Sequence, residues 1–221
     1  MDFRTIDARL RAAGLVSRGG FHPRPEDGLP GRPGTLVLAG DLGGAFWPRF
    51  RAEALDEPDP LDGWTRRVLD AAAADLGSRV LYPFDGPPHW PFQQWAMRAE
   101  GLKPSPVGPL MHPLAGLWHS YRGALLFADR IDLPPAPPID HACATCADKP
   151  CLAACPVGAF AQGRPFDLVA CLGHLRADDR SPCRTDGCLA RRACPVAPEH
   201  AYGADQRAFI AAAFFRAFGA G

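Results

Sequence analysis

Residues 143–156 read Cys143-Ala-Thr-Cys146-Ala-Asp-Lys-Pro-Cys151-Leu-Ala-Ala-Cys155-Pro156, and this stretch is expected to decide how the last part of the chain folds. It contains a C-x2-C pair, a gap of four residues, and then C-x3-C-P. A second and wider run follows, and it also ends in Cys-Pro: Cys171, Cys183, Cys188 and Cys194-Pro195. All eight cysteines lie in these two runs, so we expect one cysteine-ligated module.

The two runs resemble the two-cluster bacterial ferredoxin module, in which each run gives three thiolates to one [4Fe–4S] cluster and its fourth to the other. The resemblance implies a first cluster on Cys143, Cys146, Cys151 and Cys194. It implies a second cluster on Cys171, Cys183, Cys188 and Cys155. The second run is wider than the family pattern, and His174, three residues after Cys171, is a candidate substitute ligand.

Three other uses of the cysteines stay open. Two tetrahedral zinc sites would also use eight thiolates, but such sites favour paired C-x2-C knuckles, and only one C-x2-C occurs here. A single cluster with spare thiols is a second alternative. Four disulfides would require an exported chain, and we expect no signal peptide because the first residues contain no apolar core segment.

Composition excludes several broad classes of function. The chain has 221 residues, of which 47% are hydrophobic and 22% charged, as in ordinary globular proteins. The 24 Lys and Arg residues balance 24 Asp and Glu residues, so no global field points to nucleic acid or to a membrane surface. No apolar run reaches the roughly 18 residues of a membrane span. We therefore expect a cytoplasmic protein.

Hydrophobic periodicity and turn residues predict the other elements. Loops or linkers are expected at 21–34 and 133–138, and Gly40-Asp-Leu-Gly-Gly44 is interpreted as a tight turn rather than a phosphate loop. Asp62 is the expected N-cap of the third helix. Strands are expected at 35–39, 79–84, 107–111 and in the second part of 117–127, and helices at 2–13, 45–55, 62–76, 91–100 and 205–218. In the last helix, Phe209, Ile210, Ala213, Phe214 and Phe218 are expected to face inward.

The segment Met111-His-Pro-Leu-Ala-Gly-Leu-Trp-His-Ser-Tyr-Arg-Gly-Ala-Leu-Leu-Phe127 resembles a loop and strand of the cobalamin-processing protein CblC. Epoxyqueuosine reductases and reductive dehalogenases are similar, with a nitroreductase-like domain followed by a two-cluster ferredoxin module. The resemblance implies an α+β fold with a nitroreductase-like, CblC-like layer domain at 1–138 and a two-[4Fe–4S] module at 139–200. A closing helix at 201–221 is expected to pack back on the front domain.

This kinship also implies a corrinoid (cobalamin) between the front domain and the second cluster. Its candidate binding residues are His112, Gly116, Trp118, Tyr121 and Arg122, although core and turn roles explain the same residues. The general acid of epoxyqueuosine reductase has no matching position, so no catalytic residue is named.

The leading functional hypothesis is low-potential electron transfer through two [4Fe–4S] clusters, feeding a corrinoid-dependent reduction in the same chain. One alternative is a ferredoxin-type carrier whose front domain binds no cofactor, and another is a zinc-stabilised structural or regulatory protein. A redox partner protein is expected, and no nucleic acid. The arginines around the second run are either a solvated face or a docking patch for an acidic partner: Arg176, Arg180, Arg184, Arg191 and Arg192.

Overall fold

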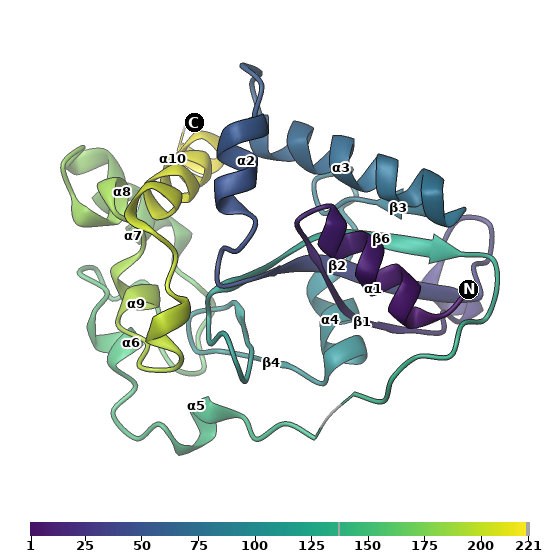
Figure 1. Ribbon diagram of the computed structural model, residues 1–221. Coiled ribbons are helices and arrows are strands. Elements are labelled where there is room, and N and C mark those ends of the chain that lie inside the picture. The colour runs from purple at the N-terminus through teal and green to yellow at the C-terminus, as the bar shows by residue number, and fades with distance from the viewer. Residues whose placement is uncertain (137, 220–221) are drawn as a thin grey trace. The chain divides into compact units, whose positions relative to one another are not determined.

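The computed structural model describes residues 1–136 and 138–219 (Figure 1), and these form two compact units. The first unit comprises Met1–Leu102 and His119–Ile139, and the second comprises Lys103–Trp118 and Asp140–Gly221. The sequence predicts a front domain over 1–138, which includes 103–118. The segment belongs to the second unit because Val107, Met111 and Leu117 share a core with cysteines of the module. In the expected linker 133–138, Pro137 lies outside the described residues.

A four-stranded antiparallel sheet organises the first unit, in the order β1-β2-β6-β3. Its strands are β1 (Val16–Phe21), β2 (Thr35–Leu42), β3 (Arg79–Leu81) and β6 (His119–Phe127). The strand predicted at 35–39 is confirmed and is longer than expected, with its first seven residues buried. The sequence analysis missed β1 because its centre, Ser-Arg-Gly-Gly, lacks the apolar alternation of a strand.

The pairing of β2 with β6 shifts register between Ala39 and Gly40. A Cβ atom on Gly40 would lie 2.1 Å from the carbonyl oxygen of Ser120, so this irregularity requires glycine. Beyond it, the carboxylate of Asp41 accepts the N–H groups of Gly44 (2.8 Å) and Phe46 (3.4 Å). These amides are occupied by the protein's own carboxylate, which accords with the interpretation of this segment as a structural turn.

Three helices pack with this sheet, α1 (Phe3–Ala12), α3 (Pro60–Leu76) and α4 (Phe92–Glu100), and α2 (Trp47–Glu53) packs against α3. In Figure 1, α3 lies on one side of the sheet and α4 on the other. The carboxylate of Asp7 ties α1 to β1 by accepting the backbone N–H (3.1 Å) and hydroxyl (2.6 Å) of Ser17. The helix α3 begins after Asp59 and not at Asp62, because Pro60 suits the first helical turn, where its missing N–H costs nothing.

Short elements build most of the second unit. The strands β4 (Lys103–Pro104) and β5 (Leu110–Met111) form a small hairpin. The helices are α5 (Ala142–Thr145), α6 (Pro150–Ala153), α7 (Leu168–Ala177), α8 (Pro182–Thr185) and α9 (Leu189–Arg192), and 3-10 turns occur at Pro25–Asp27 in the first unit and at Pro198–His200 in the second. Helices of four residues are not stable alone, so their geometry depends on the residues that they pack against.

The closing helix α10 (Ala204–Gly219) confirms the helix expected at 205–218. It packs against α7 and α8 and so belongs to the cysteine-containing unit, whereas the sequence analysis had paired it with the front domain. The guanidinium of Arg184 on α8 lies 3.8 Å from the ring centre of Phe215. Phe218 was expected to face inward but is 53% exposed. Across the residues that the structure describes, no helix is long and apolar enough to cross a membrane.

Candidate metal centre

The eight cysteines separate into two groups of four, each lining its own cavity within the second unit. The first group comprises Cys143, Cys146, Cys151 and Cys194. The second comprises Cys155, Cys171, Cys183 and Cys188 and lines a cavity of about 340 Å³. The last cysteine of each run therefore lies with the other run, which is the exchange that the ferredoxin resemblance implies.

The helices of the second unit explain why irregular spacing still brings these side chains together. Between Cys146 and Cys151, Lys149 adopts a left-handed conformation (φ 38°) and Pro150 starts α6, so the four-residue gap forms a tight reversal. Between Cys171 and Cys183, the chain completes α7, turns, and enters α8. The extra residues of the second run are thus accommodated in a helix and a turn.

Both groups meet at α6. Cys151 lies within α6 and Cys155 follows its end, four residues later. Because a chain spans at most about 3.6 Å per residue, these two cysteines lie close together, so the two groups are neighbours. A small apolar core that contains Val107, Ala190 and Cys194 packs against Cys151. This core shields the first group from solvent.

Burial and mutual repulsion set the acidity of the thiols. Burial raises the pKa of Cys143, and the nearby thiolates of Cys194 and Cys151 raise it further. In the second group, burial raises the pKa of Cys171 to about 11, with additional repulsion from the other three members. The raised pKa values of Cys143 and Cys171 favour their protonated forms, so a metal that binds these two residues as thiolates must displace protons.

Backbone amides are available to the sulfur atoms. The N–H of Ala159 donates to Cys155 Sγ at 3.3 Å. Backbone amides of Leu152 and Val196 partly offset the raised pKa of Cys151 and Cys194. Such N–H···S bonds stabilise anionic sulfur and are among the features that set the potentials of iron–sulfur proteins.

Each cavity offers four thiols, which is the number of protein ligands that a [4Fe–4S] cluster takes. Within residues 1–136 and 138–219, no three His, Cys, Asp or Glu side chains lie close enough together to hold one metal ion. In a tetrahedral zinc site with bonds of about 2.3 Å, the sulfur atoms are roughly 3.8 Å apart. The thiolates around a cubane cluster stand further apart, because they bind its separate iron atoms. Eight thiols in two groups of four are thus compatible with two such clusters.

His174, the candidate substitute ligand, lines the second cavity together with all four cysteines. Its Nε2 lies 2.8 Å from the hydroxyl oxygen of Ser181, and that hydroxyl also accepts the N–H of Cys183 at 3.3 Å. His174 therefore contacts Ser181, which lies in the turn that positions Cys183.

Arg191 connects the cysteine groups to the segment before β6. Its Nε and Nη2 donate to the carbonyl oxygen of Leu117 at 3.2 and 2.6 Å. Its guanidinium also lies 4.7 Å from the ring of Trp118 and 4.9 Å from that of Tyr202. Because Cys188 and Cys194 flank Arg191 in sequence, this clamp fixes the backbone that presents one cysteine to each group.

Other arginines of the second unit also make internal contacts. Arg192 and Arg207 both pair with Asp186, at 2.7 and 2.5 Å. Arg184 and Arg176 donate to backbone carbonyl oxygens. Arg180 is exposed. Most of the expected docking patch is therefore engaged in holding the unit together, and Arg180 remains the candidate for contact with a partner.

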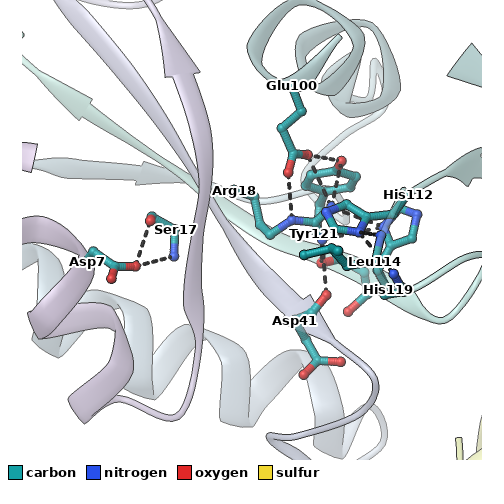
Figure 2. Close-up of polar contacts among 11 residues, drawn as sticks. Asp7, Ser17, Arg18, Asp41, Glu100, His112, Leu114, His119 and Tyr121 are labelled. Carbon is teal, nitrogen blue, oxygen red and sulfur yellow. Dashed lines mark hydrogen bonds and ion pairs between the residues drawn. The ribbon is translucent and has the colours of Figure 1, made fainter. Parts of the chain in front are cut away.

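The candidate corrinoid residues fall into the two units. In the second, His112 Nδ1 accepts the N–H groups of Leu114 (3.2 Å) and Ala115 (3.1 Å), as Figure 2 shows for Leu114. Gly116 (φ 54°) lies so close to Val196 that a Cβ would be 2.4 Å from its carbonyl oxygen. Both residues have clear structural roles in closing the loop next to the cysteines.

In the first unit, Tyr121 belongs to a buried polar cluster centred on Arg18 (Figure 2), which is 1% exposed. Arg18 Nε donates to Glu100 at 2.9 Å, and Nη2 donates to the Tyr121 hydroxyl at 3.1 Å. The Tyr121 hydroxyl in turn donates to Glu100. Arg18 also contacts His119 Nδ1 at 3.3 Å. Burial raises the pKa of Tyr121, so its hydroxyl stays protonated at physiological pH.

The remaining candidate, Arg122, lies next to Tyr121 on β6. Its Nε donates to the Ser120 hydroxyl at 3.2 Å, and its guanidinium lies 5.6 Å from the ring centre of Phe46. Sequence reasoning found Tyr121 and Arg122 but missed Arg18 and Glu100. These two are 82 residues apart and no local pattern connects them.

We expect Glu100→Ala to destabilise the first unit by about 3–5 kcal/mol, because it leaves the buried Arg18 charge without its carboxylate. The control is Asp75→Ala, which removes an ion pair with Arg9 whose carboxylate side chain is 63% exposed. That change should cost less than about 1 kcal/mol. Urea unfolding of both variants is the measurement, and equal losses would contradict the buried-pair explanation.

Among the comparisons with known proteins, only the one with solved structures finds a similarity. No protein-family model matches the chain, and no curated protein matches it in sequence. Among solved structures, the chain is similar to epoxyqueuosine reductase bound to an epoxyqueuosine-modified tRNA-Tyr stem loop (TM-score 0.56, 13% identity), covering 92% of this chain and 69% of that one. It is also similar to the Bacillus subtilis epoxyqueuosine reductase with the loop of its catalytic aspartate swung out of the active site (TM-score 0.53, 13% identity, 91% and 68% covered). The chain therefore has an α+β fold similar to that of epoxyqueuosine reductase.

Proposed function

We propose that this protein is an iron–sulfur redox protein that carries low-potential electrons through two [4Fe–4S] clusters. The observation that carries the proposal is the exchange of terminal cysteines: Cys155 lines the cavity of the second run, and Cys194 lines that of the first. Two-cluster ferredoxins use this exchange, whereas two independent zinc knuckles have no need of it.

Bound clusters would supply one-electron chemistry. The eight thiols would hold them, with Cys143, Cys146, Cys151 and Cys194 at the first and Cys155, Cys171, Cys183 and Cys188 at the second. Apolar side chains pack around Cys151 and Cys194 of the first group, and the Ala159 amide supports the Cys155 sulfur. The arrangement at α6 makes the two sites neighbours, which favours transfer between them.

We further propose that the electrons serve a corrinoid-dependent reduction in the same chain. The fold similarity to epoxyqueuosine reductase supports this, because it spans the front unit as well as the cysteine unit. The candidate corrinoid residues remain His112, Gly116, Trp118, Tyr121 and Arg122. In this role Trp118 would offer a ring clamped by Arg191, and Arg122 would offer positive charge. A carrier without a front-unit cofactor is the competing function.

The test is anaerobic reduction of cob(II)alamin by the reconstituted protein with dithionite, followed by absorbance, with Cys155→Ser as the matched variant. We expect the wild type to bind cob(II)alamin and to reduce it to cob(I)alamin, and Cys155→Ser to bind it without reducing it at the same rate. If the intact two-cluster protein neither binds nor reduces the corrinoid, the carrier function replaces the reductase proposal.

A further inference from the structure

Ser105 has a buried hydroxyl whose hydrogen-bond partner is missing. The residue follows β4 and is 7% exposed. Its backbone N–H donates to Pro109 O at 2.9 Å, and its carbonyl oxygen accepts the N–H of Gly108 at 3.0 Å. Its Oγ is buried and has no hydrogen-bond partner among the described residues. A buried polar group without a partner is costly and rare, and because Ser105 also lines a cavity, its hydroxyl is available to a group bound there.

The surroundings of Ser105 limit what that partner is. Ser105 lines the cavity of Cys143, Cys146, Cys151 and Cys194. The other residues of this cavity are mostly apolar, and its one lysine, Lys149, already donates from Nζ to the carbonyl oxygen of Cys146 at 3.1 Å. The missing acceptor is therefore expected to be anionic sulfur belonging to whatever the four thiols hold.

We propose that the Ser105 hydroxyl donates a hydrogen bond to a sulfur atom of the first cluster and thereby raises the reduction potential of that cluster. The inference rests on the proposed function. Reduction adds one electron to the cluster, so its sulfur atoms become more negative and accept a hydrogen bond more strongly. A donor at this position stabilises the reduced form over the oxidised one. Near the second group, the buried hydroxyl of Ser181 is already engaged by His174 and Cys183.

The test is a potentiometric EPR titration of the reconstituted full chain with dithionite as reductant. In Ser105→Ala, the ratio of reduced to oxidised first cluster at a fixed potential is expected to fall about tenfold, which is a downward shift of about 59 mV for one electron. The second cluster should not shift. Cys183→Ser is expected to keep only the first cluster, so its titration shows which of the two redox transitions belongs to that cluster.

Two matched variants distinguish an effect of the Ser105 hydroxyl on the reduction potential from an effect on side-chain packing. Ser105→Thr keeps the hydroxyl and should restore the wild-type potential. Ser78→Ala removes the buried hydroxyl of Ser78 in the first unit, which also has no partner among the described residues, and should shift neither redox transition. Unchanged potentials in a fully loaded Ser105→Ala protein would overturn the inference.

Pulsed EPR of the wild type in D2O decides the matter if Ser105→Ala fails to load. We expect an exchangeable deuteron coupled to the reduced first cluster in addition to those of the backbone amides that donate to Cys151 and Cys194, and Ser105→Thr should retain it. Absence of that coupling would also overturn the inference. Iron and sulfide contents are measured first on the wild type, so that a chain without clusters counts against the proposed function and is distinguishable from a failure of the Ser105 assignment.

Discussion

Cys155→Ser is expected to remove the second cluster and leave the first, lowering the iron content from about eight to about four per chain. The result is distinctive because Cys155 stands in the first run of the sequence but lines the cavity of the second. A serine oxygen is a hard donor and replaces a thiolate poorly at iron–sulfur clusters. Iron analysis and EPR of the reduced protein measure the effect.

Cys151→Ser is the matched control, since it lies four residues earlier and belongs to the first group. It should abolish the EPR signal that Cys155→Ser retains. If both variants lose the same signal, the exchange of terminal cysteines is wrong, and the two runs act as separate sites.

Removal of iron is expected to unfold much of the second unit and to leave the sheet of the first intact. Four of the second unit's helices have only four residues each, and three of them, α5, α6 and α9, contribute to a core that includes Cys151 and Cys194. Such helices lack the length to form alone, so ligation of the cluster is expected to supply part of their folding free energy.

Hydrogen exchange before and after anaerobic chelation measures this effect. Amides of 142–194 should lose most of their protection, while those of β2 and β6 keep theirs, because the sheet has its own buried core. Equal protection of 142–194 with and without iron would show that the unit folds without a metal centre.

Hydrophobic periodicity and turn residues predicted the helices and strands whose stabilising residues are close in sequence. The helix at α1 has an apolar stripe, and Pro91 with Gly101 delimits α4. The N-cap of α3 was misplaced by three residues because Asp62 and Asp59 are both suitable caps, and Pro60 decides between them. The strand β1 was missed because its residues are stabilised by partners far along the chain, such as Glu100 for Arg18.

The two ligand sets were predicted from a resemblance and stay a prediction, and the structure places each set of four around one cavity. The segment 103–118 was assigned to the wrong unit, since nothing in its composition distinguishes a core contact with Cys151 from one with the front sheet. Ser105 gave no signal in sequence at all. Its importance depends on burial and on a missing partner, which only the folded chain reveals.

Anaerobic analysis of iron and acid-labile sulfide, with zinc determined on the same sample, tests the central claim most directly. The account predicts about eight irons and eight sulfides per chain and brown protein with broad absorbance near about 400 nm. Colourless protein that contains two zinc ions and no sulfide would contradict it.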